Sequence, residues 1–139
     1  MALRIILDTM YVIGIISDKK YLPIAQAIDD GKIDSMVSVI TITELIKVLG
    51  MVDRKKAIKT VSQLKSSKID IKVLGLPIAE KAGYLRLKYD IPTADSLIGA
   101  TGIIHKASHI LTNDAHFNSI KSLIKPINYS QVLKLIKKL

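Results

Sequence analysis

The stretch LRIIL, residues 3–7, is a short apolar run that ends at Asp8 and Thr9. A strand that is covered on both faces of a parallel sheet has this character, because neither of its faces meets water. The run therefore predicts a buried β-strand near the start of the chain. Its surroundings, MALRIILDTMYVIGII, also have the hydropathy of a signal peptide, but Asp8 interrupts the run and no small-residue cleavage site follows.

The rest of the chain alternates between apolar runs and segments of helical periodicity. Further strands are predicted in residues 35–40, 69–76 and 109–113 and near Ile127. Helical segments are predicted in pieces over residues 10–30, and then over 41–50, 53–67, 77–89, 92–102 and 130–139. Strands that alternate with helices are typical of an α/β three-layer sandwich with a mostly parallel central sheet.

Length and composition set further bounds. With 139 residues, of which 49% are hydrophobic, residues 1–139 are predicted to form a single domain. The chain has no Cys, which excludes disulfides and thiolate metal sites and is compatible with a reducing cytoplasm. No apolar stretch reaches the roughly 18 residues of a membrane span. We therefore expect a cytoplasmic protein that does not contact a membrane.

The charge of the chain points to a class of partner. There are 21 Lys and Arg residues against 12 Asp and Glu residues, a formal net charge of +9. Such an excess favours a polyanionic partner through long-range attraction and counterion release. One Phe and no Trp argue against recognition of single strands by base stacking on those rings.

Four carboxylates stand where predicted strands end or helices begin, and they are Asp8, Glu44, Asp95 and Asp114. Each has an ordinary structural explanation. Asp8 and Asp114 can cap a turn or a helix, Thr41 and Glu44 have the spacing of a capping box, and Asp95 suits the first turn of a helix. Taken singly, each acid is better explained by structure than by catalysis.

Their combination suggests a site. The carboxyl ends of parallel strands lie along one edge of a sheet, and ligands bind there near a topological switch point. The four acids belong to such junctions, so we expect them to meet in one cleft. Clustered carboxylates repel unless a cation neutralises them, and an oxygen ligand set without Cys or His favours Mg²⁺ or Mn²⁺ over zinc. Outside the cleft, 8 acidic residues would remain against 21 basic ones, which suits a phosphodiester backbone.

Four segments of the chain resemble, in order, the successive motifs of the PIN-domain ribonucleases. Within that family, the chain is most similar to the VapC-type toxins. The segments are Asp8-Thr9 after the first strand, VSVITITEL (37–45), PTADSLIGATG (92–102) and ILTNDAHF (110–117). The resemblance covers nearly the whole chain and implies a Mg²⁺- or Mn²⁺-dependent endoribonuclease that leaves a 5′-phosphate and a 3′-hydroxyl. It carries Asp8, Glu44, Asp95 and Asp114 over as catalytic metal ligands, with Thr9 and Thr112 as polar supports. It also implies an RNA substrate, a homodimer and a cognate VapB-type antitoxin that wraps a hydrophobic groove near the N-terminal helices and blocks the active site.

The chain departs from the family pattern at three positions. Met10 stands where many relatives carry Asn or Ser, His116 where relatives often have a second acid, and Gly99 where Ala is common. These departures are compatible with a weaker metal site, but all four main acids remain. His116 is otherwise explained as a surface histidine of a loop.

Other interpretations stay open at this point. A housekeeping RNA-processing PIN nuclease would use the same chemistry, and a non-catalytic PIN-like binding module would share the fold without it. A phospho-acceptor signalling domain of flavodoxin-like type also gathers acids at strand ends. That class needs a second acid next to the first, and here Thr9 follows Asp8.

Overall fold

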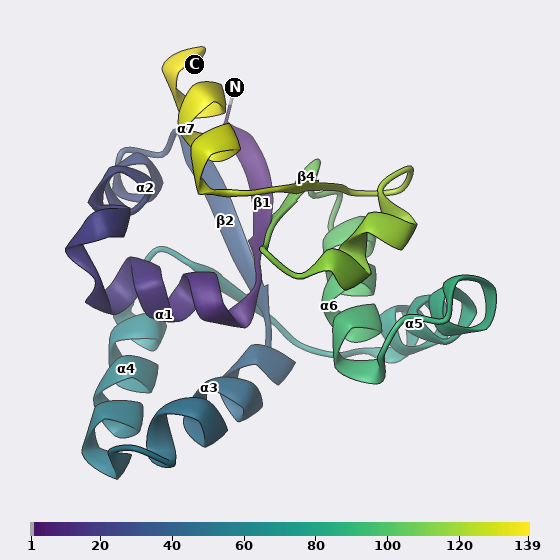
Figure 1. Ribbon diagram of the computed structural model, residues 1–139, viewed down its shortest axis with the longest axis horizontal. Coiled ribbons are helices and arrows are strands. Elements are labelled where there is room, and N and C mark those ends of the chain that lie inside the picture. The colour runs from purple at the N-terminus through teal and green to yellow at the C-terminus, as the bar shows by residue number, and fades with distance from the viewer. Residues whose placement is uncertain (1) are drawn as a thin grey trace.

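The computed structural model describes residues 2–139 of the protein (Figure 1). The described strands form one sheet in the order β3-β2-β1-β4-β5, and every pairing is parallel. They are β1 (Leu3–Leu7), β2 (Ile33–Ser38), β3 (Asp70–Lys72), β4 (His109–Leu111) and β5 (Lys125–Ile127). The predicted α/β class is confirmed, and the sheet is wholly rather than mostly parallel.

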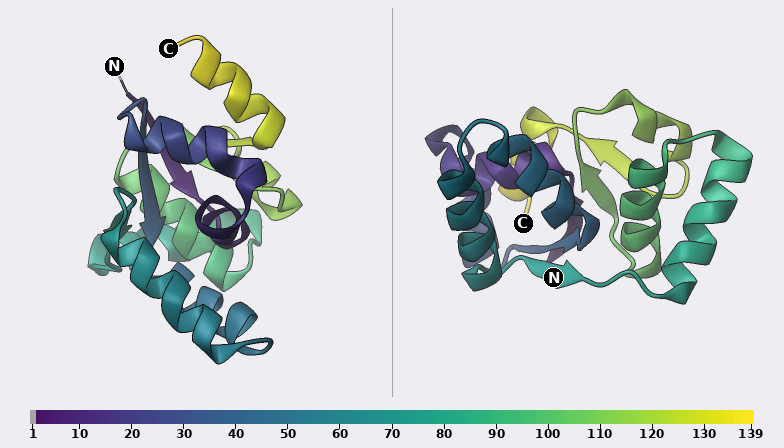
Figure 2. Two further views of the ribbon diagram at one scale, coloured as in Figure 1. Left: turned by 90° about the vertical axis from the view of Figure 1, so that its left-hand side faces the viewer. Right: turned by 90° about the horizontal axis from the view of Figure 1, so that it is seen from below.

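Helices connect the strands and cover both faces of the sheet (Figures 1 and 2). They are α1 (Thr9–Ser17), α2 (Leu22–Asp29), α3 (Ile40–Gly50), α4 (Arg54–Ser66), α5 (Leu76–Tyr89), α6 (Thr93–Ile104) and α7 (Tyr129–Lys137), with the 3₁₀ helices η1 (Lys19–Tyr21) and η2 (Ala115–Ile120). Pro23 and Pro77 lie in the first turns of α2 and α5, where a missing N–H is tolerated. Among residues 2–139, no helix combines the length and the apolar character that a membrane crossing needs.

The predicted strand over residues 69–76 is too long. Strand β3 spans only Asp70–Lys72, because it lies at the sheet edge and pairs with β2 alone. Its last residue, Lys72, is opposite Ser38, where β2 ends, and its carbonyl accepts a hydrogen bond of 2.9 Å from the backbone N–H of Val39. Val73, the next residue, is accordingly 74% exposed, and α5 begins three residues later.

Strand β1 is buried on both faces, as the apolar run predicts. Ile5, Ile6 and Leu7 are completely inaccessible to solvent. Ile5 and Leu7 belong to a core cluster with α1, α2, α3, α4 and α7, whereas Ile6 belongs to a second cluster with α5 and α6. The two clusters are the two interfaces of a three-layer sandwich, and Figure 1 shows the two groups of helices on opposite sides of the sheet.

The order of the strands reverses direction between β1 and β4. From β1 the sheet continues through β2 to β3 on one side and through β4 to β5 on the other. At this point the backbone N–H of Asp8 donates to the carbonyl of Leu111, at 3.1 Å. The crevice of an open α/β sheet forms outside the carboxyl ends of the strands at such a reversal. The fold thus places the residues that follow β1 and β4 beside each other.

Helix α6 approaches β1 closely at Gly102. A Cβ atom at this position would lie 2.8 Å from Cγ2 of Ile6 and 2.7 Å from Cδ1 of Ile124. The γ-methyl of Ile6 is held at the centre of the sheet, so it cannot move away freely. The absence of a side chain at Gly102 therefore determines how closely α6 packs on the sheet.

We expect Gly102→Ala to lower the free energy of unfolding by about 1–3 kcal/mol through overpacking. The matched control is Gly83→Ala on α5, where no non-neighbouring atom lies within 4 Å of the added Cβ. That change should raise the free energy of unfolding by about 0.5–1 kcal/mol through helix propensity. Urea denaturation measures both values, and equal effects of the two substitutions would contradict a tight contact at Gly102.

Candidate active site

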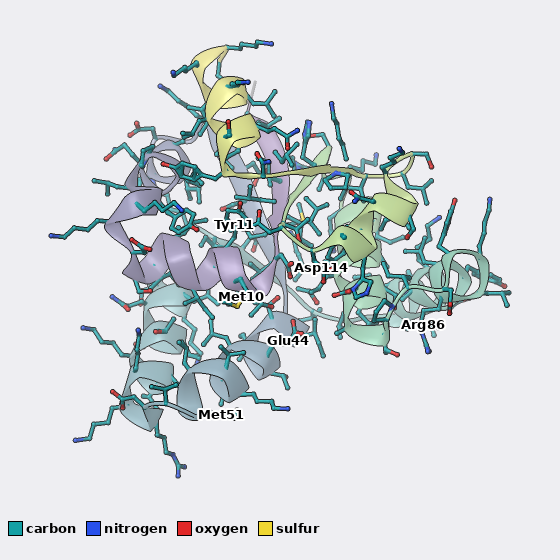
Figure 3. All side chains as sticks on the ribbon, viewed as in Figure 1. Met10, Tyr11, Glu44, Met51, Arg86 and Asp114 are labelled. Atoms are coloured by element: carbon teal, nitrogen blue, oxygen red, sulfur yellow. The ribbon has the colours of Figure 1, made fainter. Side chains whose placement is uncertain are left out.

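The four acids that were singled out from the sequence line one cleft of about 360 Å³. Its lining consists of Asp8, Thr9, Met10, Tyr11, Glu44, Val48, Asp95, Asn113 and Asp114. Figure 3 shows Met10, Glu44 and Asp114 near the centre of the molecule, where α1, α3 and η2 approach one another. The structure thus places the four carboxylates at one cleft, and their chemical role stays a prediction.

Different elements bring each acid to the cleft. Asp8 directly follows β1, and Asp114 follows β4 after two residues. Glu44 lies on α3, which follows β2, and Asp95 lies in the first turn of α6. Helix α6 leads toward the start of β4, so its own start lies near the carboxyl ends of the strands. One edge of the sheet therefore collects all four side chains.

Asp8 is held by two hydrogen bonds. Its Oδ1 accepts from the backbone N–H of Thr9 at 2.8 Å, and its Oδ2 accepts from the hydroxyl of Thr112 at 2.7 Å. Asp8 is also the N-cap of α1. The structural explanation for this acid is therefore correct, yet it does not exclude a functional one, because the cap and the cleft use the same carboxylate.

Glu44 does not form the capping box that its spacing to Thr41 allows. Helix α3 starts at Ile40 and has no side-chain cap. Instead, Oε1 of Glu44 accepts a hydrogen bond of 2.7 Å from the hydroxyl of Thr9, which is a buried residue. A buried hydroxyl requires a partner, so Thr9 and Glu44 position each other.

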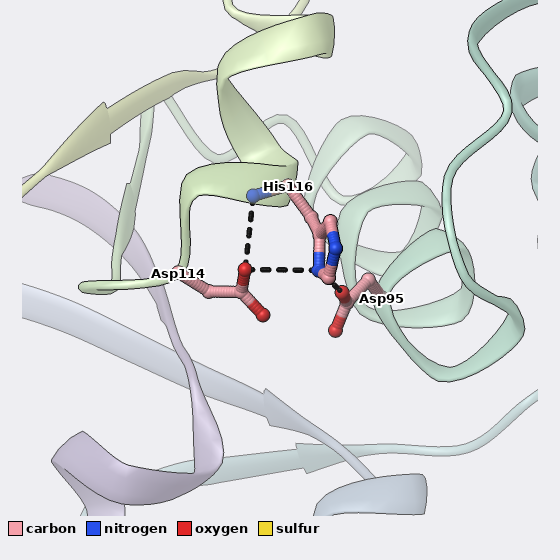
Figure 4. Close-up of side chains that lie close together, drawn as sticks. All are labelled: Asp95, Asp114 and His116. Carbon is pink, nitrogen blue, oxygen red and sulfur yellow. Dashed lines mark hydrogen bonds and ion pairs between the residues drawn. The ribbon is translucent and has the colours of Figure 1, made fainter.

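Asp95, Asp114 and His116 form a tight group (Figure 4). Nδ1 of His116 lies 3.0 Å from Oδ2 of Asp95 and 3.0 Å from Oδ1 of Asp114. The backbone N–H of His116 also donates to Oδ1 of Asp114, at 2.9 Å. The Asp95 side chain is only 14% exposed, whereas that of His116 is 59% exposed and forms the outer side of the group.

Sequence reasoning missed this contact of His116. No spacing rule links His116 to Asp95, which lies 21 residues earlier, whereas its approach to Asp114 has a local cause. The available signal is that Asp114 is the N-cap of η2, because a cap carboxylate accepts from the backbone of the residue two positions on. An N-cap at Asp114 therefore brings the residue at 116 back toward the carboxylate.

A second unpredicted network connects α7 to the cleft. The hydroxyl of Tyr11 donates to Oδ1 of Asn113 at 2.9 Å and accepts from the backbone N–H of Tyr129 at 2.9 Å. Tyr129 is the first residue of α7, while Tyr11 and Asn113 line the cleft. The start of the last helix thus helps to hold the loop that precedes Asp114.

The surroundings of Asp95 in the cleft disfavour the ionised form of its carboxyl group. Burial raises the pKa of its carboxyl group, and the neighbouring charges of Asp114 and Asp8 raise it further, to about 6. His116 acts in the opposite direction but does not cancel these effects. Desolvation and like charges both disfavour the ionised form of an acid. At neutral pH, Asp95 therefore carries a negative charge that its surroundings do not fully compensate.

The donor set fits a divalent cation. Asp95, Asp114 and His116 each offer one ligand atom, and these atoms lie within 4.8 Å of one another. Carboxylate oxygens are preferred ligands of Mg²⁺ and Mn²⁺, and a positive ion would relieve the repulsion that raises the pKa of Asp95. These residues are thus compatible with a divalent metal, although the group contains only two of the four acids singled out from the sequence and adds a histidine; Asp8 and Glu44 line the same cleft outside it.

We expect Asp95→Asn to stabilise the metal-free protein near pH 7.5 but not near pH 3.5. Because the pKa of Asp95 is about 6 in the fold and 3.8 otherwise, its contribution to stability is complete below pH 3.8 and is lost as the pH rises through 6. The difference between the variant and the wild type at high pH should reach up to about 3 kcal/mol. Urea denaturation in EDTA at the two pH values measures it.

The matched control for this experiment is Glu80→Gln, which removes one negative charge from an exposed position of α5. It tests whether a change in net charge alone produces the effect. Equal stabilisation by both substitutions at pH 7.5, or none by Asp95→Asn, would contradict the unfavourable environment of Asp95.

Comparisons with known structures agree with the fold. VapBC2 from Rickettsia felis, bound to a DNA fragment from its promoter, has a chain that matches with a TM-score of 0.71 and 20% identity, over 90% of this chain and 98% of the other. VapBC-1 from nontypeable Haemophilus influenzae matches with a TM-score of 0.70 and 18% identity, over 91% and 98%. PAE2754 from Pyrobaculum aerophilum matches with a TM-score of 0.67 and 15% identity, over 100% and 92%.

A comparison of the sequence with models of protein families identifies the family of this chain. No curated protein matches at the sequence level. The family model of the PIN domain, however, matches residues 5–123, which contain the last three residues of β1, all of α6 and all four acids of the cleft. The resemblance that the motifs suggested is thereby confirmed: this chain belongs to the PIN domain family.

Proposed function

We propose that this chain is a metal-dependent endoribonuclease, the toxin of a VapBC-type toxin-antitoxin pair. The observation that carries the proposal is the convergence of Asp8, Glu44, Asp95 and Asp114 in one cleft of a PIN domain. Similar folds occur in toxin-antitoxin complexes, among them those named VapBC from Rickettsia felis and Haemophilus influenzae. This similarity supports the toxin role over a separate role in RNA processing.

An RNA substrate is consistent with the distribution of charge. The chain has a net charge of +9, although four of its acids are gathered in the cleft. The remaining surface is therefore strongly basic and attracts a phosphate backbone. An acidic cleft alone would repel that backbone, so the proposal requires a cation between the carboxylates and the phosphate.

In this proposal, Asp8, Asp95 and Asp114 hold Mg²⁺ or Mn²⁺, and Glu44 completes the acidic group. When bound, the cation polarises the scissile phosphate and makes water a better nucleophile. Thr112 orients Asp8 through its hydroxyl, and Thr9 orients Glu44 in the same way. These uncharged donors fix the carboxylates without neutralising them, so the negative charge stays available for the cation.

Glu44 is suited to act as the general base. Its Oε1 is occupied by Thr9, while no hydrogen bond from the described residues engages Oε2. A carboxylate that is held by one oxygen and free at the other can accept a proton from an attacking water. In this scheme a bond from water to phosphorus forms, the P–O3′ bond breaks, and the departing 3′-oxygen takes up a proton, which leaves a 5′-phosphate and a 3′-hydroxyl. Because water is the nucleophile, the 2′-hydroxyl of RNA is not needed.

The proposal includes a cognate VapB-type antitoxin and a homodimer. An apolar groove of about 390 Å³ between α3 and α4 is lined by Ile46, Ile58 and Val61. Ile46 is 49% and Ile58 64% exposed, which is unusual for large aliphatic side chains on neighbouring helices. A groove of this kind accommodates the apolar face of a partner helix.

We expect Asp8→Asn to reduce RNA cleavage in the presence of Mn²⁺ by about 100-fold or more. The amide keeps the shape of the side chain but removes the charge that the cation requires. The matched control is Asp34→Asn, on β2 away from the cleft, which should retain activity. Cleavage of a single-stranded RNA is measured with Mn²⁺ and with EDTA, and a folded Asp8→Asn variant of full activity would refute the assignment.

We also expect Mn²⁺ to raise the thermal unfolding midpoint of the wild-type protein. At a concentration of 100 times Kd, binding to the folded state alone adds about 2.7 kcal/mol to the free energy of unfolding. The double variant Asp95→Asn/Asp114→Asn lacks two ligands and should show no shift. Calorimetric scans with Mn²⁺ and with EDTA give the comparison, and an equal shift in the double variant would place the cation elsewhere.

A further inference from the structure

His116 differs from the other two histidines in its position. The chain has three histidines. His109 opens β4 and His105 follows the end of α6, so both lie toward the edge of the sheet opposite the cleft. His116 alone lies against two carboxylates of the cleft. The protein therefore offers one nitrogen ligand at the place where its acids converge.

The distances at His116 resemble those between neighbouring ligands of one ion. Its Nδ1 lies 3.0 Å from an oxygen of Asp95 and 3.0 Å from an oxygen of Asp114. In octahedral coordination with bonds of about 2.1 Å, adjacent ligand atoms are about 3.0 Å apart. The two carboxylates come from α6 and from the segment after β4, so the arrangement joins parts of the chain that are distant in sequence.

The contacts of this group leave Nδ1 of His116 facing two carboxylates. Nδ1 pairs with Oδ2 of Asp95, whereas Oδ1 of Asp114 accepts from the backbone N–H of His116 and lies equally close to Nδ1. The half-buried Asp95 also experiences the charges of Asp114 and Asp8. A divalent cation would bind both carboxylates and the nitrogen lone pair at once.

The backbone that carries the imidazole of His116 is held by hydrogen bonds. The backbone N–H of His116 donates to Asp114 at 2.9 Å, and its carbonyl accepts from the hydroxyl of Ser119 at 2.9 Å. The backbone at this position is therefore fixed within η2. Less conformational freedom is lost when a ligand that is already placed coordinates an ion.

We propose that Nδ1 of His116 is a direct ligand of the divalent cation and makes this site prefer Mn²⁺ to Mg²⁺. Both ions favour carboxylate oxygens, but Mn²⁺ belongs to the first-row series that also binds nitrogen donors, whereas Mg²⁺ holds to oxygen ligands and water. The proposal rests on the metal-dependent function above but goes beyond it. The sequence argument counted oxygen ligands only, and His116 would add a nitrogen donor to the four acids that it named, at a position where relatives often carry a further acid.

Pulsed electron paramagnetic resonance of the Mn²⁺-loaded protein tests the ligand directly. The wild-type protein should show electron spin-echo modulation from a coordinated ¹⁴N nucleus, and His116→Gln should lose it. The side chain of His116 is 59% exposed, so this substitution leaves the core intact. The matched control is His105→Gln, which should retain the modulation because that residue follows the far end of α6.

Isothermal titration calorimetry with Mn²⁺ and with Mg²⁺ tests the preference. The wild-type protein should bind Mn²⁺ about tenfold more tightly than Mg²⁺ or better. His116→Asp restores an oxygen donor and should reduce that ratio several-fold, chiefly by improving the affinity for Mg²⁺. A ratio that is unchanged in His116→Asp would overturn the proposal.

The two experiments separate this proposal from the proposed function. A wild-type protein that cleaves RNA with Mn²⁺ but shows no ¹⁴N modulation overturns the ligation by His116 and leaves the nuclease in place. A protein that binds neither ion and cleaves no RNA overturns both. Modulation that is present in the wild type and absent in His116→Gln supports the ligand.

Discussion

The structure depends on the junction of β1 and β4, where the sheet reverses its order. Two hydrogen bonds join the ends of these strands: the backbone N–H of Asp8 donates to Leu111, and the hydroxyl of Thr112 donates to Asp8. The first continues the parallel ladder, and the second orients a carboxylate. A single register thus determines both the centre of the fold and the position of the first acid. Because the other strands extend outward from this pair, the cleft must form here.

The cleft shows how a PIN domain keeps acidic groups together at a cost to its own stability. The carboxylates are held by uncharged donors such as Thr9 and Thr112 rather than by Lys or Arg. Lys or Arg partners would stabilise the fold, but they would also neutralise the negative charge that the proposed cation needs. The raised pKa of Asp95 is the visible result of this arrangement. Functional sites commonly retain such unfavourable electrostatics.

The sequence predicted those parts of the molecule that depend on local pattern. The burial of β1 follows from its apolar composition, and the convergence of the acids follows from the common direction of parallel strands. The length of β3 could not be predicted, because it depends on where its neighbour β2 ends. The contact of His116 depends likewise on the meeting of α6 with η2, which only the tertiary fold brings about.

The capping-box interpretation of Glu44 failed for a related reason. The spacing from Thr41 is correct, but α3 starts one residue before Thr41, and Thr9 from another part of the chain provides the hydrogen bond.

Helix α6 connects the core of the protein to the cleft. Asp95 and Gly102 are about 10 Å apart along this stiff helix. The close packing of Gly102 on β1 therefore influences the orientation of α6 and with it the position of Asp95. A substitution at Gly102 would therefore displace Asp95 although all four acids of the cleft are intact.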